Sequence, residues 1–175
     1  MTRRPRRSWE ASGWWGQPPL WSRVRQTARA NPARLAVADD HGQDHYGDLW
    51  AEGLRHAEAL RRSGVGRGDI VLAQLPNWRE FVRLAVGAET AGVVLAFCPV
   101  HWGLRETVGA LALIRPRLWF TTTAPGQDAD RTEIVQRALG ALEGSSLTVV
   151  VRSREAPAGT IRIEDWLADA ERPSP

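Results

Sequence analysis

The chain has 175 residues, enough for one domain with a single core, and its composition of 43% hydrophobic and 25% charged residues excludes the disordered and fibrous classes. No apolar run approaches the ~18 residues of a membrane span, and no secretory signal is recognisable at the N-terminus. The single cysteine excludes an intrachain disulfide, so we expect a cytoplasmic protein without a membrane span.

Residues 1–19 have neither a helical nor a strand period, and we expect them to form an irregular, tryptophan-containing arm. All 23 basic residues are arginine; four lie in the first seven residues, which leaves 19 arginines against 20 acids and a charge of −1 elsewhere. Such a cluster can contact nucleic acid or an anionic membrane. Because no other basic face accompanies it, a solvated tail is the better interpretation, and we expect no nucleic-acid partner. The domain is then expected to span residues 20–175.

The first predicted elements of this domain are a helix and a hairpin. Apolar residues recur at helical spacing over residues 20–30, and Asn31-Pro32 ends that helix. Residues 35–38 and 44–46 have the pattern of two short strands joined by a polar turn. A second helix carries Asp48 in its first turn and ends at Gly64. Its predicted apolar face consists of Leu49, Trp50, Leu54, Ala57 and Leu60.

From residue 69 onward, short apolar runs alternate with helical stripes. Asn77 with Glu80, and Asp130 with Glu133, have the spacing of capping pairs that open two of these helices. Gly92 and Gly144 are expected to end them. The predicted strands are 69–75, 93–98, 118–121, 147–151 and 160–163, and further helices are predicted over 104–114 and 164–170. The sequence therefore predicts an α/β fold of three layers, a parallel sheet of βαβ units with helices on both faces.

Two polar segments have compositions that suit ligands. Gly64–Gly68 has the glycines of a phosphate loop, but it precedes a strand, whereas nucleotide loops follow a strand and open a helix. The hairpin could hold a metal ion, although turn formation and solubility explain the same residues more simply. The hairpin residues in question are Asp39, Asp40, His41, Asp44 and His45.

Four further side chains are considered by position. His101 and Trp102 follow a predicted parallel strand, beyond whose carboxyl end open α/β sheets bind ligands, so they could face a substrate in a complete enzyme. Packing is the simpler alternative for both. His56 is expected on a helix in a surface or packing role, and Cys98 as a small core residue, since no partner base is evident.

Five segments in order carry a family resemblance. They are Asn31-Pro32-Ala33-Arg34-Leu35-Ala36-Val37, His45-Tyr46-Gly47-Asp48-Leu49, Gly64-Val65-Gly66-Arg67-Gly68-Asp69-Ile70-Val71, Leu75-Pro76-Asn77-Trp78-Arg79-Glu80-Phe81 and Ala91-Gly92-Val93-Val94. Their order and spacing resemble the N-terminal portion of the adenylate-forming superfamily of acyl-CoA synthetases, luciferases and peptide-synthetase adenylation domains. Within it, the segments most resemble cyclohexanecarboxylate and medium-chain acyl-CoA ligases.

The resemblance assigns structural roles to ten residues and has one departure. The ten are Tyr46, Asp48, Leu49, Gly68, Asp69, Pro76, Asn77, Glu80, Gly92 and Pro99. The departure follows Gly92, where the family usually has Pro-x-x-Pro. Here a single Pro99 is followed by the atypical segment Val100-His101-Trp102-Gly103.

The resemblance implies that a carboxylate and ATP, with Mg²⁺, form an acyl-adenylate and pyrophosphate, and that the acyl group then passes to coenzyme A. In the family a Ser/Thr/Gly-rich loop ending in Pro-Lys-Gly, an acid that holds the ribose and a C-terminal lysine carry this chemistry. This chain has no such loop and no lysine. We therefore expect a truncated ligase, inactive alone, with no catalytic, cofactor-binding or metal-binding residue. Two alternatives stay open: one chain of a split ligase whose remainder is a separate chain, and a non-catalytic interaction module.

Overall fold

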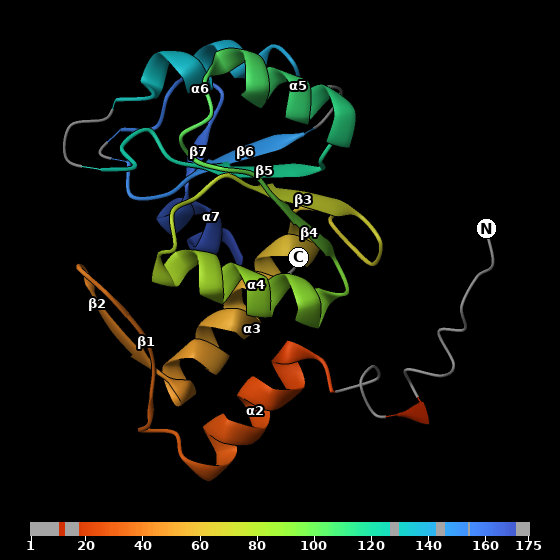
Figure 1. The fold of residues 1–175 in the computed structure, drawn as a ribbon, viewed down its shortest axis with the longest axis vertical. Coiled ribbons are helices and arrows are strands. Elements are labelled where there is room, and N and C mark those ends of the chain that lie inside the picture. Colours follow the sequence, from red (N-terminus) through yellow and green to blue (C-terminus); the bar gives the residue numbers. More distant parts are fainter. Residues whose placement is uncertain (1–10, 13–17, 127–129, 143–145, 154, 171–175) are drawn as a thin grey trace.

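The fold is seen in a computed structural model that describes residues 11–12, 18–126, 130–142, 146–153 and 155–170 (Figure 1). Most of the predicted arm, and Gly144, lie outside the described residues. In chain order the elements are α2 (Leu20–Ala30), β1 (Leu35–Asp39), β2 (Gly42–His45), α3 (Tyr46–Arg62), β3 (Ile70–Ala73), α4 (Arg79–Ala91), β4 (Val94–Phe97), α5 (Leu104–Ile114), β5 (Leu118–Thr121), α6 (Thr132–Leu139), β6 (Leu147–Val150), β7 (Ile161–Arg162) and α7 (Ile163–Ala170).

A five-stranded parallel sheet forms the centre of the molecule, with the strand order β4-β3-β5-β6-β7. Helices α5 and α6 cover one face, and α4 and α7 lie on the other, with α3 and α2 behind them (Figure 1). The three-layer α/β prediction is therefore confirmed. None of the described helices is long and apolar enough to cross a bilayer.

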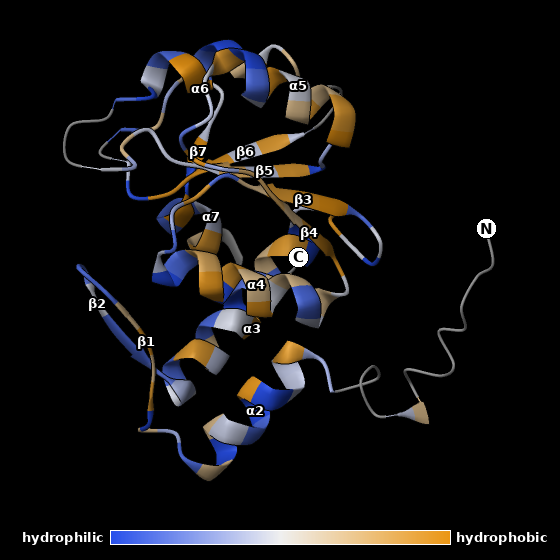
Figure 2. Ribbon diagram, in the orientation of Figure 1, coloured by the Kyte–Doolittle hydropathy of each residue, from blue (hydrophilic) through white to orange (hydrophobic). Residues whose placement is uncertain are grey.

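The central strands β3 and β5 are buried on both faces because they are apolar at successive positions (Figure 2). Val71 and Phe120 belong to the core cluster that packs against α3, α4 and α7. Leu72 and Trp119 point to the other face and pack with residues of α5 and α6. All four side chains are fully buried, so each face of the sheet has its own hydrophobic core.

Helices α3 and α4 approach each other closely at two glycines. A Cβ atom at Gly53 would lie 2.5 Å from Cγ1 of Val86, and one at Gly87 would lie 2.5 Å from Cβ of His56. Both distances are too short for real side chains. The two glycines therefore allow a contact between the helices that any larger residue would prevent.

The predicted hairpin is confirmed as the antiparallel pair β1–β2, which lies apart from the main sheet (Figure 1). A third core cluster, which includes Val24 of α2, Leu49 of α3 and Val86 of α4, joins α2 to the rest of the fold.

The start of α3 is capped by a side chain. His45 precedes α3, and its backbone N–H donates to the Asp48 carboxylate at 3.1 Å. Asp48 thus caps the start of α3 in addition to its favourable charge in the first turn.

The capping predictions for the later helices were wrong. Helix α4 begins after Trp78 with no side-chain cap, so Asn77 is not its N-cap. Glu80 instead accepts from Arg152 at 2.7 Å, because a charge-assisted bond to a guanidinium is stronger than a neutral capping bond. Asp130 does accept from the backbone N–H of Thr132 at 2.8 Å, but Glu133 pairs with Arg137, so no capping box forms.

The prediction was also wrong for one residue of the apolar face of α3. Leu54 is 42% exposed, whereas Leu49, Ala57 and Leu60 are buried as predicted. Helix α3 is covered by α4 and α2 along a stripe that does not reach Leu54, so this side chain faces solvent.

Candidate functional site

The topology of the sheet defines a candidate site at one edge. Strand β3 precedes both of its neighbours, β4 and β5, in sequence. Helix α4, which connects β3 to β4, lies on one face, whereas α5, which connects β4 to β5, lies on the other (Figure 1). The chain therefore reverses its direction across the sheet between β3 and β5. Open α/β sheets bind ligands outside the carboxyl ends of the strands at such a switch point.

The carboxyl edge, defined here as residues 74–78, 98–103, 121–123 and 151–153, contains the segments that follow β3, β4, β5 and β6. Gln74 lies at the switch point itself, because its backbone N–H donates to the carbonyl oxygen of Phe120 at 2.8 Å. The candidate site is the part of the carboxyl edge that surrounds Gln74.

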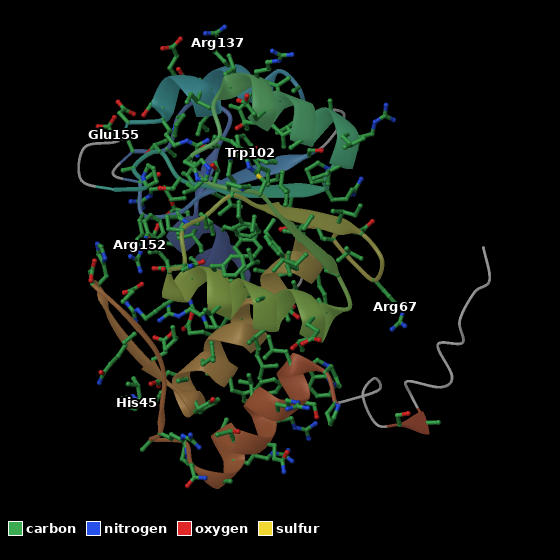
Figure 3. All side chains as sticks on the ribbon, in the orientation of Figure 1. His45, Arg67, Trp102, Arg137, Arg152 and Glu155 are labelled. Atoms are coloured by element: carbon green, nitrogen blue, oxygen red, sulfur yellow. The ribbon has the colours of Figure 1, made fainter. Side chains whose placement is uncertain are left out.

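A tight turn follows β4 at this edge. The backbone N–H of Trp102 donates to the carbonyl oxygen of Pro99 at 3.3 Å, which closes a β-turn over residues 99–102. His101 is exposed, and Trp102 is half-buried against the core cluster beneath α5 (Figure 3). Trp102 therefore packs against the core, which is the simpler of the two alternatives for this residue. That His101 and Trp102 face a substrate stays a prediction.

The turn is bonded to a glutamine that the sequence analysis missed. Gln74 is fully buried, and its Nε2 donates to the carbonyl oxygen of Pro99 at 3.2 Å and to Oγ1 of Thr107 at 3.1 Å. Its Oε1 has no hydrogen-bond partner among the described residues. The available signal was a glutamine between apolar residues near the end of the predicted strand 69–75.

The turn is also bonded to an arginine that the sequence analysis missed. Arg131 is 5% exposed, and its Nη2 donates to the carbonyl oxygen of Trp102 at 3.2 Å. Its Nη1 is buried without a hydrogen-bond partner, and within the described residues no carboxylate forms an ion pair with it. Burial lowers the pKa of Arg131, against the small opposing effect of nearby Cys98. Nothing in the local sequence distinguishes this arginine from the 22 others.

Cys98 is a buried core residue, as predicted. Burial raises the pKa of its thiol to about 11, although the nearby charge of Arg131 lowers it. The thiol is therefore neutral at physiological pH and is not a nucleophile.

On the other face of the sheet, an ion-pair network joins the carboxyl edge to the hairpin. Arg152, which follows β6, pairs with Asp39 of β1 and with Glu80 of α4, and its guanidinium lies 4.4 Å from the centre of the Trp78 ring. Figure 3 shows Arg152 on the α4 side of the sheet, away from Trp102. Burial raises the pKa of Asp39, but hydrogen bonds from the Arg79 backbone and from Arg152 outweigh it and hold the pKa well below its ordinary range.

Two of the hairpin residues suggested as metal ligands, Asp39 and Asp44, are bound by arginines instead. Asp44 is 2% exposed and accepts from Arg79 at 2.8 Å and from Arg83 at 2.7 Å. Burial raises the pKa of Asp44, but these two guanidinium groups outweigh it and lower the pKa overall. Among the described residues, no group of three or more histidine, cysteine or acidic side chains could hold a metal ion.

The glycine-rich segment before β3 lies at the opposite, amino edge of the sheet. The backbone N–H of Gly68 donates to the carbonyl oxygen of Gly92 at 3.0 Å, and the Asp69 carboxylate accepts from the N–H of Gly66 at 2.8 Å. Gly92 ends α4 in the left-handed conformation, with φ of 75°, as predicted. These two backbone donors thus bond to the segment's own turn and to the end of α4.

The remaining motif residues fall into two places. Tyr46, Asp48 and Leu49 form the first turn of α3 beside the hairpin, where the Tyr46 N–H donates to the carbonyl oxygen of Arg34 at 2.9 Å. The others, Pro76, Asn77, Glu80 and Pro99, lie at or beside the carboxyl edge, and Asn77 is exposed there. The structure therefore brings only this second group near the candidate site.

His56 has the packing role that was one of its two expected roles. The residue is 1% exposed, its Nδ1 lies 2.7 Å from the carbonyl oxygen of Glu52, and its ring meets the edge of Trp166. Burial lowers its pKa to about 4, so the imidazole is neutral at physiological pH. It lies between α3 and α4, away from the carboxyl edge.

Comparison with known proteins identifies relatives of the chain. It is 30% identical over 119 residues to the medium-chain fatty-acid–CoA ligase of Escherichia coli K12, an alignment that covers 67% of this chain and 21% of that protein. It is 37% identical over 100 residues to the salicyl-AMP ligase/salicyl-S-ArCP synthetase of Mycobacterium tuberculosis H37Rv, covering 54% of this chain and 18% of that protein. The chain thus spans about a fifth of the length of these relatives.

A solved structure shares the fold. The apo structure of Mycobacterium smegmatis MbtA matches 97% of this chain with a TM-score of 0.76 and 24% identity, and the match covers 30% of the MbtA chain. A family model described as AMP-binding enzyme matches residues 24–174. Since this match includes every strand and helix of the three-layer fold except the start of α2, the chain belongs to the AMP-binding enzyme family of the adenylate-forming superfamily.

Proposed function

We propose that this chain supplies the N-terminal α/β part of an AMP-forming acid–CoA ligase. In the reaction implied by the family, a carboxylate attacks ATP to give an acyl-adenylate and pyrophosphate, and the acyl group is then transferred to coenzyme A. One observation carries the proposal: the family match over residues 24–174 contains all five strands of the sheet and its switch point. ATP, Mg²⁺ and coenzyme A are ligands of the complete ligase in this proposal.

We further propose that these 175 residues alone do not form an acyl-adenylate. Charge that develops on the triphosphate must be stabilised by fixed positive groups and backbone donors. The lysines that the family resemblance assigns to that task have no counterpart here, because the chain contains no lysine. Arg131 is buried beneath the turn at the carboxyl edge, and Arg152, which lies at that edge, is held by two carboxylates.

The acyl group and the location of the enzyme are also proposals. A relative named for medium-chain fatty acids and another named for salicylate both match, so we propose a carboxylic acid of moderate size, either aliphatic or aromatic. We place the enzyme in the cytoplasm because Cys98, a buried free thiol, suits a reducing compartment.

The test is carboxylate-dependent exchange of pyrophosphate into ATP by the purified chain. Octanoate, cyclohexanecarboxylate, benzoate and salicylate would be offered, with the E. coli medium-chain ligase as the positive control. We expect no exchange above background with any acid. Formation of acyl-AMP by the chain alone would contradict the proposal. In addition, the DNA that follows codon 175 can be translated in all frames; a Ser/Thr/Gly-rich loop ending in Lys-Gly would support a ligase made of more residues than these.

A split ligase is a second candidate, and the edge of the sheet favours it. Strand β4 lies at one end of the strand order, and two of its side chains face solvent: Val94 is 51% exposed and Phe97 is 75% exposed. An apolar edge strand with unpaired backbone groups is a template for a strand of another chain. If the remainder of the ligase is a separate polypeptide, this edge is the proposed contact.

Co-expression with the polypeptide encoded downstream distinguishes these possibilities. In a split ligase, Phe97→Glu would abolish co-purification, whereas Leu54→Glu, a matched change of an exposed leucine on α3, would preserve it. Loss of binding in both variants, or in neither, would argue against β4 as the contact. A chain that stays monomeric and binds no such polypeptide would favour the non-catalytic interaction module.

A further inference from the structure

We propose that Gln74 and Arg131 are positioning residues that hold the turn Pro99–Trp102 in a fixed shape at the switch point before any ligand binds. The inference deepens the proposed function, and it rests on that function for the claim that the turn faces a ligand. It concerns two buried side chains from separate elements, one after β3 and one before α6, that bond to opposite ends of the same four-residue turn.

Gln74 fixes the first residue of the turn. The carbonyl oxygen of Pro99 accepts two bonds, one from the N–H of Trp102 that closes the turn and one from Nε2 of Gln74 at 3.2 Å. The second N–H of the amide reaches Thr107 in the first turn of α5 at 3.1 Å. Because the side chain is fully buried, breaking either bond would leave a donor without water to replace the acceptor. The amide therefore joins β3, the turn and α5 at one point.

Arg131 fixes the last residue of the turn. The bond from its Nη2 to the carbonyl oxygen of Trp102 is the one hydrogen bond of its guanidinium among the described residues. A buried guanidinium without a carboxylate partner costs stability, and an apolar side chain of the same length would avoid that cost. Packing alone therefore does not explain an arginine here. Arg83 and Arg152, which are also partly buried, both have carboxylate partners.

The two contacts leave the middle of the turn free. Val100 is half-buried and His101 is exposed between the two bonded ends, at the carboxyl edge where α/β sheets bind ligands. A turn whose ends are already fixed loses little conformational entropy when a ligand contacts it. Side chains locked by a supporting layer of buried polar groups are the usual means of preparing such a site.

Hydrogen exchange of the turn amides in the 175-residue chain tests the inference, with the Trp102 N–H as the principal reporter. Gln74→Met and Arg131→Met each remove the donors while they keep the length of the side chain. Arg131→Lys keeps a charged donor. Thr148→Val is the matched control, because Thr148 is buried on the same face of the sheet with an unpartnered hydroxyl and makes no recorded contact with the turn.

We expect exchange over residues 100–103 to be about tenfold faster in both methionine variants, as for the loss of one buried hydrogen bond. Arg131→Lys is expected to stay within about twofold of the parent, and Thr148→Val to match it. Unchanged exchange in both methionine variants would overturn the inference, as would equal acceleration in β5 and α3, which indicates general loosening. Acceleration in one variant alone would overturn the role of the other residue. None of these exchange rates depends on ligase activity. The pyrophosphate-exchange assay therefore tests the proposed function separately from this inference.

Discussion

His56 lies between α3 and α4 as a buried, neutral histidine, and this makes stability depend on pH. Its pKa is about 4 in the fold and 6.5 in the unfolded chain, so the unfolded chain binds more protons between these values. Stability is therefore lost as the pH falls from 6.5 towards 4, by about 3 kcal/mol at full extent. Asp39 and Asp44, whose pKa values are lowered, lose their contributions only below about pH 4, the unfolded value, so the two windows are distinct.

Urea unfolding at pH 7, 5.5 and 4.5 measures this effect. His56→Gln, which has no titrating group, is expected to be less stable than the parent at pH 7 and to show a much shallower decline with acid. A decline as steep as that of the parent chain would assign the pH dependence to other residues.

Asp44 is the carboxylate on which two arginines of α4 depend. Its removal would leave Arg83 without its ion-pair partner in the hairpin and would leave Arg79 with Asp39 alone. Since breaking a buried pair leaves an uncompensated charge, Asp44→Asn is expected to lower the free energy of unfolding by about 3–5 kcal/mol. Asp165→Asn, which breaks the exposed pair with Arg162, should leave it unchanged. Equal effects in denaturant unfolding would show that burial does not decide the strength of these pairs.

At the scale of the elements, the contact between α3 and α4 depends on glycine. A Cβ at Gly87 would lie 2.5 Å from the Cβ of His56 and 2.9 Å from the backbone oxygen of Gly53, so the helices would have to separate. Gly87→Ala is expected to destabilise the chain by about 1–3 kcal/mol. Gly109→Ala on α5, where no atom lies within 4 Å, should instead stabilise it by up to about 1 kcal/mol. Thermal unfolding of the pair gives the comparison; a stabilising Gly87→Ala would contradict the close packing.

The elements themselves were predictable because their cues are local. Strand β5 and helix α5 were predicted within a residue of their bounds. The spacing of apolar residues that distinguishes a short strand from a helix depends only on residues close together in sequence. The N-cap at Asn77 was mispredicted because Glu80 bonds to Arg152, 72 residues away. The candidate site was only partly predictable for the same reason. His101 and Trp102 could be placed at the end of a strand, but Gln74 and Arg131 acquire their partners only from the folded chain.

At the scale of the whole molecule, Arg152 joins parts that are far apart in sequence. It connects the end of β6 to Asp39 of the hairpin, 113 residues away, and to α4 through Glu80. Arg152→Met is expected to cost about 3 kcal/mol and to make the hairpin turn at residues 39–42 more accessible to proteases. Arg137→Met, which breaks an exposed pair with Glu133, should change neither. Limited proteolysis followed by mass spectrometry measures the accessibility; cleavage unaltered by Arg152→Met would mean that the ion pairs of Arg79 and Arg83 and the core cluster around Leu49 hold the hairpin without Arg152.

The strand order has a consequence for synthesis on the ribosome. Strand β3 is made before either of its neighbours, and its second neighbour, β5, begins 45 residues after β3 ends. At about 5–20 residues per second, this delay lasts roughly 2–9 seconds. For that time one edge of the apolar strand Ile70–Ala73 lacks its neighbour, even after β4 has been made, and a chaperone or another nascent chain can bind this edge.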